Sequence, residues 1–116
     1  MADKLKIEVS HGRGRAVVLR VRGRIDGRSA PELMQRGLAE QAPNRDLILN
    51  LSEVDFVSSA GVGAIMVLAE TASRQGGSLR LSPASEAVLS VLGILNLDQF
   101  LQIDPSESAG LEALGG

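Results

Sequence analysis

The sequence predicts an α/β fold in which a small mixed β-sheet of about five strands, partly parallel, is backed by four helices. Two observations carry this prediction. Short aliphatic runs alternate along the chain with segments of helical periodicity, which is typical of parallel strands covered by helices. In addition, 33 of the 116 residues are Leu, Val or Ile, enough for one compact core in a chain of this length. We therefore expect a single domain over residues 1–116.

The chain begins with a predicted hairpin, and a helix follows it. Two strands, at residues 5–9 and 16–22, are joined by a glycine-rich turn. Ser29 and Glu32 then match a Ser-x-x-Glu capping box, in which each side chain satisfies a free backbone N–H at the start of a helix. The box predicts a helix over about residues 30–42, because a Pro-Asn pair comes directly after it.

The middle of the chain predicts a buried strand, a helix and a further strand. Residues 47–51 form a nearly continuous aliphatic run, which is typical of a strand buried on both faces. After a connecting stretch, Ser58 opens a second helix with apolar residues at helical spacing, and Gly76 closes it. Residues 78–81 are the next expected strand.

The last part of the chain predicts two helices and a short strand. Residues 82–86 start a third helix, which ends near Gly93, and residues 100–103 form the last strand. Asp104 and Glu107 match a second capping box and predict a C-terminal helix. The predicted order of elements is therefore β-β-α-β-α-β-α-β-α.

Composition excludes several classes of site. The sequence has no Cys, so a disulfide framework, a Cys-ligated zinc site and a thiol nucleophile are excluded. His11 is the one histidine, and Phe56 and Phe100 are the two aromatic residues, too few for stacking nucleic-acid bases. The longest apolar run, residues 60–69, is too short to span a bilayer. Because the first residues also lack the apolar core of a signal peptide, we expect a cytoplasmic protein.

Charge is unevenly distributed along the chain. Residues 1–45 carry ten basic and five acidic side chains, whereas residues 46–116 carry two basic and nine acidic ones. Arg20 and Arg22 alternate with apolar residues, which indicates a strand with one solvated face. Two interpretations stay open for them, an arginine-rich exposed sheet surface and a phosphate-binding stripe. The asymmetry itself favours a charged protein partner.

The segment that could carry chemistry lies where a buried strand turns into a helix, at residues 58–63. The first turn of a helix presents unpaired N–H groups, and the helix dipole favours negative charge there. Ser58 has a structural explanation, because Ser is a preferred N-cap. Ser59 has none, since a second hydroxyl is not needed for capping. Small neighbours leave room for another molecule to approach.

Enzyme motifs are incomplete in this segment. A Gly-x-Ser-x-Gly nucleophile elbow would need Gly where Val57 stands, and His11 lies far upstream of any triad position. A dinucleotide-binding Gly-x-Gly-x-x-Gly would need Gly at Met66, and no phosphate-loop Lys follows. Glu53 and Asp55 are interpreted as solvated charges. We therefore expect no enzymatic activity, no catalytic residues, no cofactor and no metal site.

Four motifs together resemble one family. Residues 55–63, Asp-Phe-Val-Ser-Ser-Ala-Gly-Val-Gly, resemble the phosphorylation-site loop of the STAS domain, which occurs in sulfate transporters and bacterial anti-sigma factor antagonists. Residues 23–26 are similar to the family's Gly-x-Leu/Ile-Asp segment. Residues 76–81 and 92–97 resemble its Gly-Gly strand entry and its Leu-x-x-x-Gly-Leu helix end. The resemblance spans about residues 5–114, with its pieces in the family's order.

The resemblance implies a stand-alone, STAS-like anti-sigma factor antagonist that regulates transcription by partner switching. When unphosphorylated it would bind an anti-sigma factor that is also a serine kinase, and so release a sigma factor. Phosphorylation would end this binding, and a metal-dependent serine phosphatase would reset the protein. Aligning the family's loop on Gly61 places the acceptor on Ser59. Ser58 stands where the family has Asp, which leaves Ser58 as a second candidate acceptor. Asp26 is carried over as a neighbour of the acceptor loop.

The implied partner-binding residues come from this loop and the segment after the second strand. They are Asp26, Ser58, Ser59, Ala60, Gly61, Val62 and Gly63. The expected protein is a monomer or weak dimer with no direct contact to nucleic acid and no membrane insertion. One alternative is a STAS subunit that docks permanently on a transporter or other signalling complex. Another, a small nucleotide-handling enzyme, is disfavoured by the missing phosphate loop and catalytic base.

Overall fold

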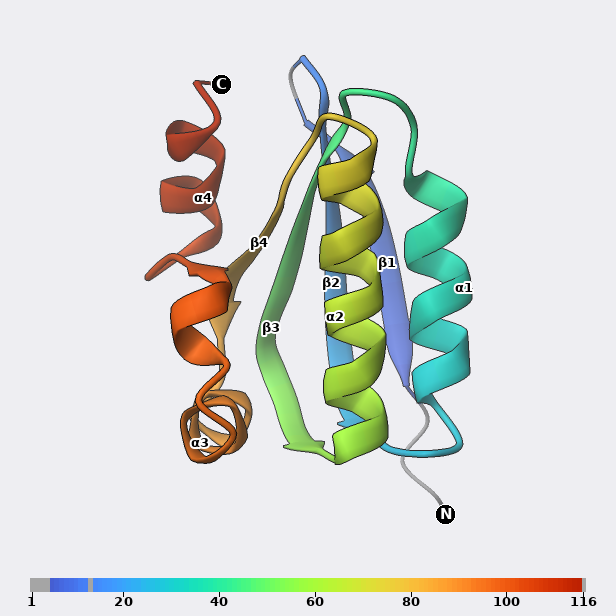
Figure 1. The fold of residues 1–116 in the computed structure, drawn as a ribbon, viewed down its shortest axis with the longest axis vertical. Coiled ribbons are helices and arrows are strands. Elements are labelled where there is room, and N and C mark those ends of the chain that lie inside the picture. Colours follow the sequence, from blue (N-terminus) through green and yellow to red (C-terminus); the bar gives the residue numbers. More distant parts are fainter. Residues whose placement is uncertain (1–4, 13, 116) are drawn as a thin grey trace.

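The protein is a five-stranded mixed sheet with four α-helices and one short 3-10 helix, counted over residues 5–12 and 14–115, which the computed structural model describes (Figure 1). The strands are β1 (Lys6–His11), β2 (Ala16–Ile25), β3 (Asp46–Val57), β4 (Leu79–Ala84) and β5 (Gln102–Ile103). The helices are α1 (Ala30–Glu40), α2 (Ser59–Arg74), α3 (Glu86–Ile94), η1 (Asp98–Phe100) and α4 (Glu107–Ala113). The fold class and the order of strands and α-helices are as predicted from the sequence, whereas η1 was not predicted and contains Phe100, which the sequence assigned to the last strand.

The sheet has the strand order β1-β2-β3-β4-β5. β1 is antiparallel to β2, and every later neighbouring pair is parallel. Helices α1 and α2 pack side by side on one face, over a core that includes Leu19, Leu49 and Leu81 (Figure 1). On the opposite face, Ala16, Val18 and Ile48 are buried, while Arg20, Asn50 and Arg80 are polar. No helix in the described ranges is both long and apolar enough to cross a membrane.

The first four strands all end later than predicted. β3 continues through residues 52–57, which were predicted as a connection, because this stretch pairs with β2 with two register shifts along the way. The irregular pairing explains the missing alternation of apolar and polar residues. β4 runs to Ala84, so α3 begins later than predicted and takes Ser85 as its cap, whose side chain accepts from Val88 N–H. The predicted turn at residues 10–14 includes Arg13, which lies outside the described residues.

Both predicted capping boxes are wrong. The Ser29 hydroxyl donates to the Arg24 carbonyl oxygen at 2.6 Å and does not cap α1. The cap of α4 is Ser106, because the Asp104 carboxylate instead accepts from the Arg80 guanidinium. In both places another partner competes successfully with the capping motif: a carbonyl oxygen five residues upstream for Ser29, and a guanidinium 24 residues away for Asp104.

Candidate functional site

The two segments singled out by the sequence lie at the same edge of the sheet. β2 and β3 are parallel and pair up to Ile25 and Val57. The Ser58 N–H then donates to the Ile25 carbonyl oxygen at 2.9 Å. The loop after β2, which carries Asp26, is therefore next to the start of α2 (Figure 1). This arrangement follows from parallel pairing, since the carboxyl ends of parallel strands meet at one edge.

Ser58 is the N-cap of α2, as its structural interpretation predicted. Its backbone is extended, with φ −97° and ψ 176°, and its hydroxyl oxygen accepts from the Gly61 N–H at 3.4 Å. Its carbonyl oxygen accepts from the Val62 N–H at 3.0 Å. The half-buried Ser58 side chain is thus part of the helix start.

Ser59 is the first residue of α2 and is exposed, as is Ala60. The Ser59 hydroxyl makes no hydrogen bond to any residue that the structure describes. Unlike the Ser58 hydroxyl, the Ser59 hydroxyl can therefore bind or react with another molecule without breaking a hydrogen bond within the described chain.

The remaining predicted contacts of this loop divide into buried and exposed residues. A Cβ on Gly61 would lie 2.7 Å from the Ile25 carbonyl oxygen and from Val57 Cγ2, so only glycine lets α2 start this close to the strand ends. The Val62 side chain is 4% exposed and belongs to the core, so its predicted contact with a partner stays a prediction that its burial does not favour. Gly63 is exposed, and a Cβ there would meet nothing within 4 Å.

Asp26 organises the loop beside Ser58. Its carboxylate accepts from the backbone N–H groups of Arg28 at 3.0 Å and Ser29 at 3.1 Å. These bonds, first that from Ser29 and then that from Arg28, lower the pKa of Asp26. The carboxylate is therefore ionised at neutral pH and adds a negative charge at this edge. Arg24 lies 4.0 Å from it.

A cation–aromatic pair at the same edge was not anticipated from the sequence. The Arg24 guanidinium lies over the Phe56 ring, 4.1 Å from its centroid, because the two residues are partners in the β2–β3 register. The rarity of aromatic residues in this chain was the one signal that could have directed attention to Phe56. Stacking of this kind is worth about 0.5–1 kcal/mol at an exposed site.

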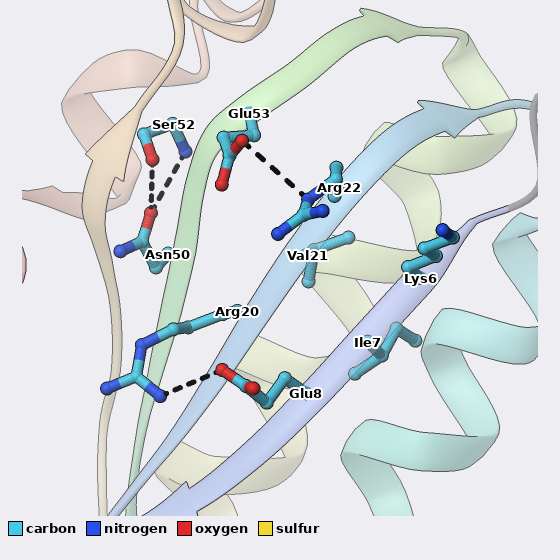
Figure 2. A pocket seen from close by; sticks show the side chains of 9 residues that line it. All are labelled: Lys6, Ile7, Glu8, Arg20, Val21, Arg22, Asn50, Ser52 and Glu53. Atoms are coloured by element: carbon cyan, nitrogen blue, oxygen red, sulfur yellow. Dashed lines mark hydrogen bonds and ion pairs between the residues drawn. The ribbon is translucent and has the colours of Figure 1, made fainter.

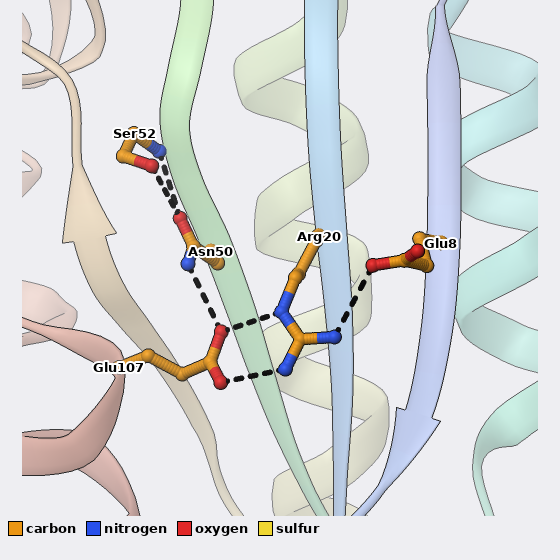
Figure 3. Close-up of polar contacts among 5 residues, drawn as sticks. All are labelled: Glu8, Arg20, Asn50, Ser52 and Glu107. Atoms are coloured by element: carbon orange, nitrogen blue, oxygen red, sulfur yellow. Dashed lines mark hydrogen bonds and ion pairs between the residues drawn. The ribbon is translucent and has the colours of Figure 1, made fainter.

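Arg20 and Arg22 of β2 lie on the polar face of the sheet, where they line a shallow hollow of about 230 Å³ (Figure 2). Arg20 forms a bidentate pair with Glu107 and a further contact with Glu8 (Figure 3). Arg22 lies 3.6 Å from Glu53. Because carboxylates already pair with these guanidinium groups, the structure favours the solvated-surface interpretation over a phosphate-binding stripe.

The edge around Ser59 offers a hydroxyl and free helix N–H groups rather than a reaction centre. Within residues 5–12 and 14–115, no three His, Cys, Asp or Glu side chains are grouped so that they could hold a metal ion. The nearby carboxylate, Asp26, is engaged by its own loop. What this arrangement can do chemically is present a serine to the active site of another protein.

Comparison with known proteins identifies the family. The STAS domain model matches residues 7–110, so the chain belongs to the STAS domain family. More particularly, its relatives within this family include an anti-sigma factor antagonist. The anti-sigma-B factor antagonist of Bacillus subtilis is 31% identical over 98 residues, which cover 83% of this chain and 88% of the relative.

Solved structures agree on the fold. An anti-sigma factor antagonist from Mycobacterium paratuberculosis has a TM-score of 0.86 at 24% identity, covering 97% of this chain and 96% of that one. The Bacillus cell fate determinant SpoIIAA in its phosphorylated form has a TM-score of 0.71 at 17% identity, covering 94% and 99%. The family and the fold that the sequence motifs indicated are thus confirmed.

Proposed function

We propose that this protein is an anti-sigma factor antagonist that switches partners through phosphorylation of Ser59. When unphosphorylated it binds a cytoplasmic anti-sigma factor that is also a serine kinase, and so frees a sigma factor. The kinase phosphorylates Ser59 and releases the protein, and a metal-dependent serine phosphatase restores it. The protein itself catalyses nothing and touches no nucleic acid. The name of the Bacillus subtilis relative supports the antagonist role.

The observation that carries the proposal is the contrast between the two adjacent serines. The Ser58 hydroxyl caps α2, whereas Ser59 is exposed on the first helical turn. Phosphate on Ser58 would remove a cap worth about 1 kcal/mol. Phosphate on Ser59 would remove no contact, and helix N–H groups tolerate its charge. This difference favours Ser59 over Ser58 as the acceptor.

The added phosphate acts on the interface and leaves the fold intact. A phosphoserine brings about −1.5 to −2 charges and three acceptor oxygens. A partner packed on Ala60 and Gly63 would have to cover this charge, and Asp26 adds a negative charge at the same edge rather than a counter-charge. Burial of an unpaired charge costs several kcal/mol. Since each 1.4 kcal/mol is about tenfold in affinity, we expect a loss of about 100-fold or more.

The test is a pull-down from cell extract with and without ATP, followed by mass spectrometry of both partners. We expect an anti-sigma factor kinase to be retained without ATP and released with it, with phosphate on Ser59. Ser59→Ala should keep the partner in both conditions. Ser73→Ala, at another exposed serine of α2, should behave like the wild type.

Two outcomes would overturn the proposal. Phosphate found only on Ser58 would mean that Ser58, and not Ser59, is the acceptor. A partner that stays bound in ATP, with no phosphate on either serine, would instead indicate the permanently docked STAS subunit. A third measurement addresses catalysis: ATP hydrolysis that copurifies with the protein and is lost on a substitution at this edge would contradict the non-enzymatic role.

A further inference from the structure

A hydrophobic hollow of about 310 Å³ lies between α2 and η1. Its lining comes from Met66, Val67, Ala69, Glu70 and Phe100. Two of these side chains are large, apolar and exposed, with 42% of Val67 and 71% of Phe100 accessible. Phe100 is one of only two aromatic residues in the chain. An aromatic ring left this exposed next to an apolar helix face marks a surface that another molecule can cover.

The hollow faces the same direction as Ser59. An α-helix turns by about 100° per residue. Viewed down the helix axis, Gly63 is therefore rotated from Ser59 by about 40°, and Met66 and Glu70 are each rotated by about 20°, in opposite directions. Val67 and Ala69 flank this direction. Leu68 is rotated by about 180° and packs against Gly37 of α1, where a Cβ would lie 2.6 Å from its methyl groups. The exposed side of α2 is therefore one continuous surface from Ser59 to Glu70.

The two ends of this surface are close enough for one partner. Eight residues separate Ser59 from Val67, which is about 12 Å along the helix axis at 1.5 Å per residue. A stable protein–protein interface covers about 800 Å² on each partner, a patch much wider than this separation. Gly63, between the two ends, is exposed and has open space where a Cβ would be, so it permits close approach by another backbone.

We propose that the anti-sigma factor that covers Ser59 also inserts a large apolar side chain into the hollow between Val67 and Phe100. The inference rests on the proposed function and assigns different roles to the hollow and to Ser59. The hollow supplies affinity through a buried apolar anchor, and Ser59 supplies the switch. Anchors of this kind usually carry most of the binding energy of an interface. Phosphate at Ser59 then releases the partner by preventing the close approach that the anchor requires.

The experiment measures binding by calorimetry to the kinase identified in the pull-down, purified as recombinant protein. We compare wild type with Phe100→Ala, Val67→Ala and a control, Leu38→Ala. Leu38 is 40% exposed, nearly the same as Val67, but it lies on α1. We expect affinity to fall about tenfold or more for Phe100→Ala and several-fold for Val67→Ala. The control should stay within about twofold, and all three variants should unfold near the wild-type temperature, since these side chains are exposed.

The outcomes separate the two proposals. If phosphorylated Ser59 abolishes binding while Phe100→Ala and Val67→Ala bind as well as wild type, the hollow is not an anchor point and the partner switch stands. If the wild type does not lose its partner on phosphorylation, the proposed function fails and the anchor proposal fails with it. Analytical ultracentrifugation tests whether a second copy of the chain occupies the hollow instead. If the protein forms a dimer that Phe100→Ala dissociates while affinity for the kinase is unchanged, the hollow is a dimer contact and the anchor proposal is wrong.

Discussion

The first turns of α2 and α4 are built in the same way. Each helix has a serine cap: the Ser58 hydroxyl accepts from Gly61 N–H at 3.4 Å, and the Ser106 hydroxyl accepts from Ala109 N–H at 3.0 Å. Each also has a buried glycine in the first turn or just after it, Gly61 in α2 and Gly110 in α4, where a Cβ would clash with the sheet. Local construction alone would therefore suggest the same role for both helix starts.

Their surroundings differ. Glu107 of α4 accepts from Arg20 at 2.9 and 2.8 Å and from Asn50 at 3.0 Å (Figure 3). Asp104, just before α4, pairs with Arg80. In the described chain, the first turn of α2 has no acidic residue. The charges at α4 are paired within the fold, whereas the Ser59 hydroxyl at the start of α2 makes no hydrogen bond to any described residue. The two helix starts thus share their capping and differ in whether their polar side chains are paired within the fold, and the proposed role of Ser59 rests on this difference.

Removal of the carboxylate before α4 should have the largest effect on stability. Asp104→Ala leaves Arg80 without its partner, and the two side chains are only 17% and 10% exposed. An unpaired buried charge costs about 3 kcal/mol or more. Urea unfolding should detect this loss of stability, while Asp55→Ala, at an exposed carboxylate, should change it by less than about 0.5 kcal/mol. A small effect of Asp104→Ala would mean that α4 is held mainly by apolar contacts.

The second effect in size concerns the buried glycine of α2. In Gly61→Ala, the new methyl group would lie 2.7 Å from the Ile25 carbonyl oxygen, which is backbone and cannot rotate away. We expect a loss of about 2 kcal/mol from overpacking, seen as a melting temperature lower by about 10 °C. Wild-type stability in this variant would show that the start of α2 can shift. A tightly packed glycine would then no longer be a requirement that α2 shares with α4.

Acid should weaken the anchoring of α4. Hydrogen bonds from Arg20 lower the pKa of Glu107, and hydrogen bonds from Arg80 lower the pKa of Asp104. Each folded-state pKa lies below its unfolded value of about 4.3 or 3.9. The stabilisation is therefore present above that unfolded value and is lost as pH falls through the folded pKa. Glu107→Gln should reduce stability by about 1 kcal/mol at pH 7 and by less at pH 3. Equal losses at both pH values would contradict the ionic anchor.

The smallest expected effect is at the exposed glycine of α2. Gly63→Ala adds a methyl group that meets nothing within 4 Å, and alanine is a better helix former by about 0.5–1 kcal/mol. The folded state should become slightly more stable, while affinity for the kinase partner decreases because the added methyl group lies under the proposed interface. Thermal unfolding and calorimetry on one preparation separate the two effects. Improved stability with unchanged affinity would remove Gly63 from the binding surface.

The order of elements was predictable because each element carries its own signal. Aliphatic runs marked the central strands, and the glycine pair after α2 marked the end of that helix. The capping role of Ser58 could also be predicted, since an N-cap needs only the N–H of a residue three positions later. The contrast between Ser58 and Ser59 follows from the same local rule.

The structure alone decided what depends on contacts between distant residues. The irregular end of β3 becomes a strand because β2 pairs with it. Asp104 matches a helix-capping motif in the sequence, but in the structure its carboxylate pairs with Arg80, which is 24 positions away. The hollow beside α2 requires Phe100, which comes from a different element. Periodicity and capping patterns report interactions within a few residues, whereas ion pairs, bulges and shared surfaces depend on which distant segments the packed core brings together.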